Sequence, residues 1–387
     1  MKTIELLKLN EKNSPPSHLY FRPQGKGKIE GALHLFSSAK VKKLSLRFLI
    51  FFLFLPVLKA APFRAEKKSL TMEEKLKIFF QKDNVIVGVT DSGLGGLSVM
   101  AEATERMKEA GIFRKVNFVY FNALFSEAGY NSLKSHAEKV QIFNSALYSL
   151  EKNFHPDLIL IACNTLSVIY GETLFSKKSS IPVAGIVDTG VELIGESLKK
   201  NPDSLVIIFA TKTTVEEGTY KKMLIEKGFE PERIITEPCT ELVNYIEKDY
   251  QSDETDMLIF FCVDEALKKV PDPKPPLYAS LNCTHFGYSL ELWKKAFEKQ
   301  GIKPLAILNP NSRMIDFLFE PQRLGRFKET EIRARVVSMV EISQEKIKSL
   351  GEWLRNLSPQ AASALESYEL KPNIFEWKKF IQGKAPY

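Results

Sequence analysis

The feature that most constrains the fold is an alternation of short apolar runs with longer polar segments, which extends from residue 84 to residue 308. Runs such as 85–90, 158–162 and 205–210 are apolar throughout, as is typical of strands covered on both faces of a parallel sheet. The segments between them have the length of helices, so the pattern predicts repeated βαβ units. The other strands are expected at 117–121, 182–187, 233–236, 278–282 and 305–308.

The alternation is longer than one sheet comfortably holds, so we expect an α/β protein of two lobes. Each lobe should have a mainly parallel sheet flanked by helices, with the active site in the cleft between the lobes. The predicted division is 84–190 for lobe 1 with a return segment at 305–325, and 191–304 for lobe 2. Residues 326–387 are expected to form a helical tail. With 387 residues and 44% hydrophobic content, the chain can supply both cores.

The N-terminal part has a different composition. Residues 1–40 are rich in Lys, Ser, Pro and Gly and are predicted to be disordered. Residues 41–61 carry basic residues before an apolar run at 48–58, which is shorter than the roughly 20 residues that span a bilayer. This pattern is typical of a secretory signal, although it begins far from residue 1. Three interpretations remain open: a secretory signal with the true start site downstream of Met1, a membrane anchor, or a buried helix. Export or anchoring is favoured.

The charge balance argues against a nucleic-acid partner. Lys and Arg number 54 against 47 for Asp and Glu, which gives a net charge of +7. Much of this excess lies in the first 70 residues, and elsewhere the lysines occur as pairs rather than as a basic stripe. We expect a small-molecule substrate, no nucleic acid, and membrane contact only through 48–58. A homodimer is compatible with the sequence, which does not fix the oligomeric state.

Two of the four cysteines share a context that indicates chemistry. Cys163 follows the predicted strand at 158–162, and Cys283 follows the one at 278–282. Side chains just beyond the carboxyl ends of parallel strands line the ligand crevice. A helix that begins at either cysteine would lower the pKa of its thiol. Cys239 and Cys262 fit small buried apolar residues better.

Two thiols in one crevice suit proton transfer at a carbon next to a carboxylate. One thiolate can remove the proton from one face while one thiol returns a proton to the other, which inverts the configuration without a cofactor. A disulfide between Cys163 and Cys283 is the competing interpretation, especially for an exported protein. A metal site is not expected, because the chain has five histidines and no CxxC or HxxxH spacing.

Five ordered motifs between residues 84 and 320 resemble those of the cofactor-independent aspartate/glutamate racemases, and of the glutamate racemases in particular. They are Val-Gly-Val-Thr-Asp-Ser-Gly-Leu-Gly-Gly-Leu at 87–97, Ile-Ala-Cys-Asn-Thr at 161–165, Ala-Thr-Lys-Thr-Thr at 210–214 leading into Gly-Thr-Tyr at 218–220, Cys-Thr-Glu-Leu-Val at 239–243 extending to Glu247, and Asn-Cys-Thr-His at 282–285. The resemblance implies racemisation of glutamate or a related acidic amino acid, as a step that supplies peptidoglycan synthesis.

The resemblance also implies roles for individual residues. Cys163 and Cys283 would be the two opposed bases, with Asp91 supporting the first and with Glu247 and His285 tuning the second. Hydroxyl and amide groups suit the amino and carboxylate groups of a substrate. The residues implied to hold these groups are Ser92, Asn164, Thr165, Thr211, Thr214 and Thr284. Taken without the resemblance, Asp91 fits a turn or cap residue equally well, and Thr211 and Thr214 fit a helix N-cap.

Two stretches depart from the family pattern. The usual Pro-Tyr-Gly loop is absent, and Ala128, Gly129 and Tyr130 stand in its place as expected substrate contacts. Leu-Asn-Pro-Asn at 308–311 replaces an acidic turn. These departures bring the identity of the substrate into question, so aspartate and hydantoin-type substrates stay open.

Alternatives from other classes also remain. A non-catalytic exported solute-binding protein would share two lobes, a cleft and a signal-like segment. The glycine-rich turn at 93–96 matches only part of a dinucleotide-binding fingerprint, because Ser98 occupies the third glycine position. Location divides the hypotheses further, since 41–61 indicates export whereas a glutamate racemase would act in the cytoplasm.

Overall fold

The computed structural model of the protein describes residues 70–133 and 135–381. By its contacts the chain divides into Met1–Glu66 and Lys67–Tyr387, and the described fold is that of the second unit. The predictions for 1–40 and 41–61 therefore lie outside the described residues. Among the helices at 70–133 and 135–381, none has both the length and the apolarity to cross a bilayer.

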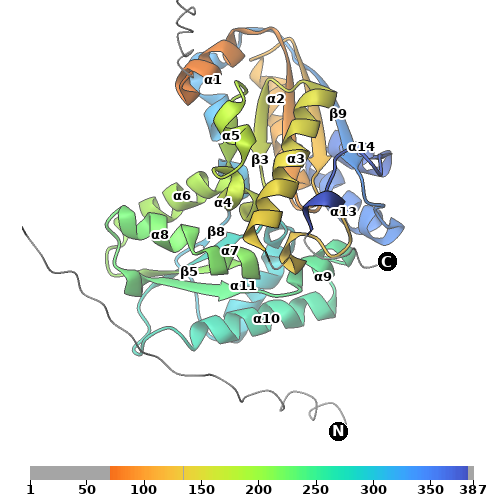
Figure 1. Ribbon diagram of the computed structural model, residues 1–387. Helices are drawn as coiled ribbons and strands as arrows, with labels where there is room; N and C mark the ends of the chain where they lie inside the picture. The colour runs from red at the N-terminus through yellow and green to blue at the C-terminus, as the bar shows by residue number, and fades with distance from the viewer. Residues whose placement is uncertain (1–69, 134, 382–387) are drawn as a thin grey trace, which may run out of the picture. The chain divides into compact units, whose positions relative to one another are not determined.

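Two parallel sheets form the framework of the described unit (Figure 1), which confirms the predicted fold class. Every strand pairing is parallel. In spatial order the first sheet is β10 (Glu369–Leu370), β9 (Glu331–Ser338), β2 (Lys115–Asn122), β1 (Asn84–Asp91), β3 (Leu158–Ile161) and β4 (Val183–Gly185). The second is β6 (Ile234–Pro238), β5 (Leu205–Ala210), β7 (Leu277–Asn282) and β8 (Ile307–Leu308).

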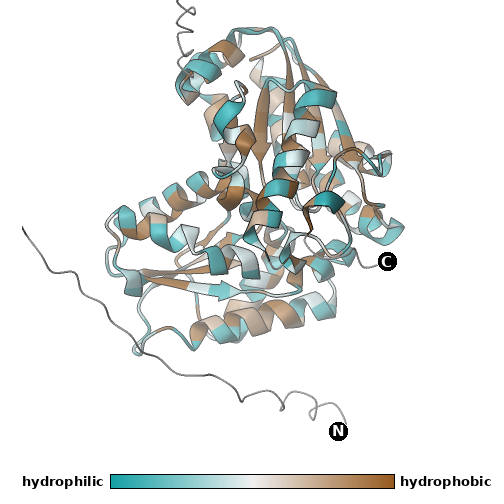
Figure 2. Ribbon diagram, viewed as in Figure 1, coloured by the Kyte–Doolittle hydropathy of each residue, from teal (hydrophilic) through white to brown (hydrophobic). Residues whose placement is uncertain are grey.

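Helices connect and cover these strands. They are α1 (Met72–Gln81), α2 (Leu97–Ala110), α3 (His136–Phe154), α4 (Asn164–Tyr170), α5 (Leu174–Lys178), α6 (Ile186–Lys200), α7 (Lys212–Glu217), α8 (Thr219–Glu226), α9 (Leu242–Lys248), α10 (Asp253–Leu267), α11 (Leu290–Lys299), α12 (Pro310–Arg313), α13 (Gln344–Leu357) and α14 (Pro359–Glu366). In Figure 2 the strands are mostly apolar, while many helices carry hydrophilic residues away from the sheets.

The two faces of the first sheet bury different sets of side chains, because successive residues of a strand point to opposite sides. Leu158 and Leu160 of β3 join the core that contains residues of α2, α13 and α14. Ile159 and Ile161 of the same strand join the core that contains residues of α3 and α4. The first of these cores continues under the second sheet, where it includes Phe209 of β5 and residues of α10 and α11. One apolar core therefore links the two sheets.

The C-terminal part differs from its prediction. Residues 326–387 were expected to be helical, but Glu331–Ser338 forms β9, which pairs with β2 along its whole length. Within the return segment predicted at 305–325, Ile307–Leu308 pairs with β7 of the second sheet, whereas Asp316 forms an ion pair with Arg106 of α2. In its first half β9 alternates exposed charged residues with partly or fully buried ones, which is the period of a strand; the prediction of a helix followed the charge content and not this period. The boundaries of the two lobes by residue number stay a prediction.

The register of the strands brings several chain segments to one place. The last residue of β1, Asp91, is paired with Asn122, and Ala210 at the end of β5 is paired with Asn282 at the end of β7. Parallel strands share the edge at which they end, so the residues that follow them meet there. Cys163 and Cys283 both lie just beyond such ends.

Candidate active site

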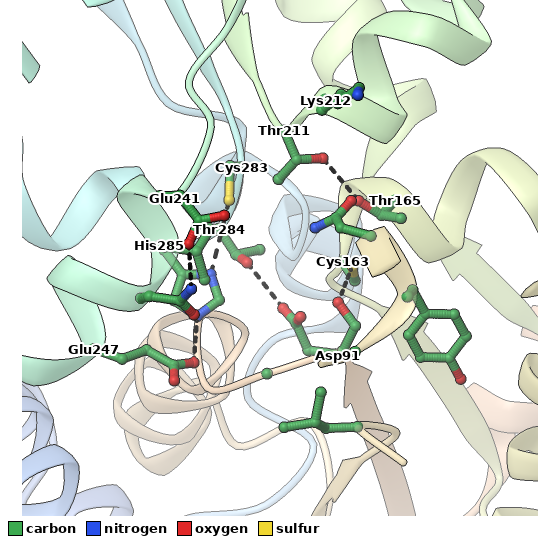
Figure 3. Close-up of a pocket in the computed structure, with 18 of the residues that line it drawn as sticks. Asp91, Cys163, Thr165, Thr211, Lys212, Glu241, Glu247, Cys283, Thr284 and His285 are labelled. Carbon is green, nitrogen blue, oxygen red and sulfur yellow. Dashed lines mark hydrogen bonds and ion pairs between the residues drawn. The ribbon is translucent and has the colours of Figure 1, made fainter. Parts of the chain in front are cut away.

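A cavity of about 510 Å³ lies at the carboxyl ends of β1, β3, β5, β6 and β7. Most of the residues predicted for the site line it, and only Thr214 of the predicted set does not. The predicted residues that line it are Asp91, Ser92, Ala128, Gly129, Tyr130, Cys163, Asn164, Thr165, Thr211, Glu247, Cys283, Thr284 and His285. In Figure 3 the two cysteines come from different sides, Cys283 beside His285 and Cys163 on the side of Thr165.

Cys163 is the N-cap of α4. Its sulfur accepts a hydrogen bond from the backbone N–H of Leu166 at 3.5 Å and lies 3.1 Å from the hydroxyl of Ser92. Burial nevertheless raises the pKa of the Cys163 thiol, and the charge of Asp91 raises it further. The expectation of a lowered pKa at Cys163 is therefore wrong, although the bond from the helix N-terminus acts in the predicted direction. Desolvation of the thiolate outweighs the dipole of a helix that is only two turns long.

Cys283 lies beside a hydrogen-bonded relay of two buried groups. Its sulfur is 3.7 Å from Nδ1 of His285, and Nε2 of His285 is 2.8 Å from Oε1 of Glu247. The same carboxylate oxygen accepts a hydrogen bond at 3.0 Å from the backbone N–H of Leu94, in the turn after β1. The relay therefore connects the cysteine to α9 and to the glycine-rich turn.

The pKa values of the relay follow from burial and mutual attraction. Burial would raise the pKa of Glu247, but the hydrogen bond and charge of His285, together with Lys346, lower it to about 2. Burial would lower the pKa of His285, but its contacts with Cys283 and Glu247 raise it to about 10. An ionised carboxylate beside an imidazolium is the arrangement that these shifts favour.

Asp91 lies between the two cysteines rather than serving only the first. Its side chain is buried, and its Oδ2 accepts a hydrogen bond from the hydroxyl of Thr284 at 2.9 Å. Burial raises the pKa of Asp91, while the charge of His285 and the bond from Thr284 act in the opposite direction. Asp91 also interacts with Cys163. Asp91 therefore contacts both cysteine motifs, through Thr284 in one and Cys163 in the other.

Hydroxyl and amide groups gather at the junction of α4 and α7. The hydroxyl of Thr165 lies 3.0 Å from that of Thr211 and 3.3 Å from that of Thr214. Thr211 is the N-cap of α7, as the cap interpretation predicted, and accepts a bond from the backbone N–H of Thr214 at 3.4 Å. Asn164 accepts a 2.5 Å bond from the hydroxyl of Tyr220, and its Nδ2 has no partner among the described residues. That N–H₂ group is free to donate to a ligand.

The loop that replaces Pro-Tyr-Gly reaches the cavity as expected. Gly129 has φ of 59°, a conformation that glycine adopts without strain. Tyr130 is buried and packs edge-on against Phe125, with ring centroids 5.1 Å apart. In the turn at 308–311, Asn311 donates to the backbone carbonyl of Thr284 at 3.0 Å. Both departures from the family pattern therefore contact or line the site.

The glycine-rich turn fits closely against the second cysteine motif. A Cβ on Gly95 would lie 2.3 Å from the hydroxyl of Thr284 and 2.6 Å from Nδ1 of His285. A Cβ on Gly93 would lie 2.9 Å from Oε1 of Glu247. The glycines thus let the backbone approach protein groups, which accounts for the turn without a bound nucleotide.

The structure adds residues that the sequence analysis did not single out. Lys346 of α13 lies 2.7 Å from Oε2 of Glu247, although it is 99 positions further along the chain. Lys212 and Glu241 also line the cavity. Glu241 has φ of 64°, which is rare for a residue with a side chain and is often found at functional sites. No short sequence motif marks Lys346, because only the fold brings α13 to α9.

The state of the cysteines and the arrangement of possible metal ligands bear on two alternatives, a disulfide and a metal site. Cys163, Cys239, Cys262 and Cys283 are all free thiols, so the competing prediction of a disulfide between Cys163 and Cys283 is wrong for this structure. Over 70–133 and 135–381, no cluster of three or more His, Cys, Asp or Glu side chains is arranged to hold a metal ion.

Comparison with known proteins identifies relatives of one kind. No family model matches the chain. The glutamate racemase of Clostridium botulinum is 32% identical over 225 residues, which are 56% of this chain and 78% of the relative. The glutamate racemase of Nitratiruptor is 24% identical over 274 residues, or 70% of this chain and 96% of the relative.

Solved structures share the fold. The Bacillus anthracis glutamate racemase isoform RacE1 matches with a TM-score of 0.56 at 16% identity, over 76% of this chain and 99% of that one. The Francisella tularensis glutamate racemase, solved in complex with D-glutamate, matches with a TM-score of 0.53 at 22% identity, over 71% of this chain and 95% of that one.

The fold and these relatives together define the class: the chain is an amino-acid racemase, an isomerase. Its identity to the Clostridium botulinum protein, over more than two thirds of that protein's length, shows the family. The chain belongs to the aspartate/glutamate racemase family, alongside the glutamate racemases.

Proposed function

We propose that the protein interconverts L- and D-glutamate by proton transfer between Cys163 and Cys283, without a cofactor. The observation that carries the proposal is that two free thiols from different sheets line one cavity. Each has its own set of polar partners, Ser92 and Asp91 for Cys163 and the His285 relay for Cys283. The glutamate racemases among the relatives give the choice of substrate.

The two thiols have different polar neighbours, and the proposal assigns them different starting states. Burial and the charge of Asp91 favour the neutral thiol at Cys163. Nδ1 of His285, whose pKa is raised to about 10, lies 3.7 Å from the sulfur of Cys283. In one direction, the Cys283 thiolate takes the α-proton, the electron pair delocalises into the carboxylate, and the Cys163 thiol donates its proton to the opposite face. The proton count is unchanged and no group is oxidised or reduced.

The substrate's charged groups have counterparts in the cavity. The unpartnered Nδ2 of Asn164 and the hydroxyl groups of Thr165 and Thr211 can donate to a carboxylate. Lys212, which lines the same cavity and lies 3.7 Å from Glu216, can turn its charge to a second carboxylate. An acidic amino acid fits this set of donors.

Single cysteine variants test the mechanism. Cys163→Ala and Cys283→Ala should each lose racemisation by at least about a thousandfold, the size expected when one acid–base group is removed. Each variant should still eliminate chloride from one stereoisomer of 3-chloroglutamate, because that reaction needs one base only. Full racemisation by either variant would refute the two-cysteine mechanism.

Isotope exchange tests the substrate. In D₂O the wild-type protein should introduce deuterium at the α-carbon of glutamate, and the same measurement should be made with aspartate and a hydantoin. Faster exchange with aspartate or the hydantoin would refute glutamate as the substrate. It would also indicate that the loop at 128–130, which replaces Pro-Tyr-Gly, recognises that other substrate.

We also propose that the D-glutamate enters peptidoglycan, as expected for the family, and that 41–61 is a signal or anchor segment. These two proposals make opposite demands on location, because peptidoglycan precursors are assembled inside the cell. Cell fractionation with N-terminal sequencing of the mature chain decides between them. A chain that keeps 41–61 in the soluble cell fraction would refute export.

A further inference from the structure

Lys346 holds the far end of the relay that ends at Cys283. Its Nζ is 2.7 Å from Oε2 of Glu247, while the other oxygen of that carboxylate bonds His285 at 2.8 Å and the backbone N–H of Leu94 at 3.0 Å. The Glu247 side chain is 6% exposed and that of Lys346 is 29% exposed. This ion pair is therefore largely shielded from water, unlike a surface pair of the kind that contributes little.

Helix α13 is built so that Lys346 reaches this position. Ser343 caps the helix and accepts a bond from the backbone N–H of Lys346 at 3.4 Å. Trp353 packs edge-on against Tyr288, with ring centroids 4.7 Å apart, and the hydroxyl of Tyr288 bonds the carbonyl of Leu94. A cation in the first turn of a helix is disfavoured by the helix dipole. The position of Lys346 therefore serves its contact with Glu247 rather than the stability of α13.

The charges around Glu247 explain what Lys346 adds. The groups that face or influence the relay are His285, Lys346, Asp91, Tyr120, Tyr288 and Cys283. Burial raises the pKa of both tyrosines well above its usual value, so they stay neutral. When His285 gives up its proton, Lys346 is the cation that remains in contact with Glu247. Without it, a buried carboxylate would be left unpaired and would take up the proton itself.

We propose that Lys346 is a positioning residue for one half of the racemase reaction: it keeps Glu247 ionised and oriented in both protonation states of His285, so that His285 can support Cys283. This proposal rests on the two-cysteine function proposed above. It assigns helix α13 a part in the chemistry at Cys283 and none in the chemistry at Cys163. Lys346 acts through Glu247 and His285 rather than on the substrate.

The half-reactions separate the two cysteines, so the effect should be one-sided. With 3-chloroglutamate, the base takes the α-proton, chloride leaves with the C–Cl electron pair, and the resulting enamine is hydrolysed to 2-oxoglutarate and ammonia. Lys346→Met in the Cys163→Ala background, where Cys283 is the base, should lower kcat about tenfold at neutral pH. The same substitution in the Cys283→Ala background should change the rate by less than twofold.

The pH profile gives a readout that a merely structural role would not move. Removal of a cation raises the pKa of every acid near it, so the profile of the Cys283 reaction should move to higher pH by about one unit in Lys346→Met. Lys346→Arg keeps the charge and should restore the wild-type profile. Lys348→Met, an exposed lysine on the same helix, is the matched control and should leave rate and profile unchanged.

The possible outcomes separate this proposal from the function on which it rests. Equal losses in both backgrounds, a rise of KM alone, or a lower rate with an unmoved pH profile would each overturn the role of Lys346. If Cys163→Ala or Cys283→Ala still racemises glutamate at the wild-type rate, the two-cysteine function fails instead. A one-sided loss with an alkaline shift, rescued by Lys346→Arg, supports the proposal.

Discussion

Substitution of Gly95 by alanine should damage the relay at Cys283 more than any comparable change of one methyl group in a loop. The added Cβ would lie 2.3 Å from the hydroxyl of Thr284 and 2.8 Å from the backbone nitrogen of His285. Thr284 can turn its hydroxyl away only by giving up its bond to Asp91. The backbone nitrogen must move by about 0.6 Å to reach an ordinary contact of 3.4 Å (3.4 − 2.8 = 0.6).

Two costs follow from this geometry. Overpacking costs about 1–3 kcal/mol of unfolding free energy, and the loss of the Thr284 bond to a buried carboxyl group adds about 1–3 kcal/mol. A displacement of most of an ångström in a catalytic group lowers kcat by up to about a hundredfold. We expect Gly95→Ala to lose both stability and activity, with the activity loss concentrated in the Cys283 half-reaction.

Denaturant unfolding and glutamate racemisation followed by circular dichroism measure the two effects. Gly171→Ala is the matched control, because a Cβ there would meet no atom within 4 Å. The close approach would be refuted if Gly95→Ala were as stable and as active as Gly171→Ala. A loss of stability with normal activity would show that the turn yields without moving His285.

Three further predictions concern stability. The pKa of Glu247 is about 2 in the folded protein, against an ordinary value of 4.5. The stability that this carboxylate contributes is therefore complete above about pH 4.5 and is lost as the pH falls toward 2. In denaturant titrations, the unfolding free energy of Glu247→Gln should depend less on pH between pH 6 and pH 2.5 than that of the wild type. Thr284→Val should cost about 1–3 kcal/mol because Asp91 loses a buried donor, whereas Thr284→Ser should cost less; equal losses would contradict the role of the hydroxyl. Trp293→Ala should cost about 3–5 kcal/mol through the cavity it leaves beside Phe209, while Trp293→Phe should cost much less, since the indole N–H has no partner in the described part of the chain.

The sequence predicts most closely those elements whose signal is local. β5 spans the predicted 205–210 because an apolar run bounded by polar residues leaves few alternatives for a strand buried on both faces. β9 was missed because its charged residues were taken as a solvated helix, although Arg333 and Arg335 are exposed at the two-residue spacing of a strand. Helix α10 has weak helical periodicity for the opposite reason, because apolar side chains surround much of it.

The part of the site that could be predicted consists of the residues that directly follow strands. Cys163 and Cys283 meet in one cavity because parallel strands end at one edge in each sheet, and this rule needs only the strand assignments. The bond of Thr284 to Asp91 and the contact of Lys346 with Glu247 depend on how helices pack after the sheets form. Such contacts between distant residues leave no periodic signal in a single sequence.

The one electrostatic expectation that proved wrong is informative about the mechanism. Two cysteines with equally lowered pKa values would both be thiolates, and two bases without an acid leave the carbanion without a proton donor. The structure instead buries Cys163 beside the acidic Asp91. Cys283 lies next to the imidazole of His285, which is bonded to Glu247, and Glu247 is in turn paired with Lys346. A racemase that uses two thiols needs one thiol and one thiolate at the start of each turnover, and the raised pKa of Cys163 favours the neutral thiol there. Each turnover leaves the opposite proton arrangement, from which the reverse reaction begins, so proton exchange between the two sites and solvent has to precede another turnover in the same direction.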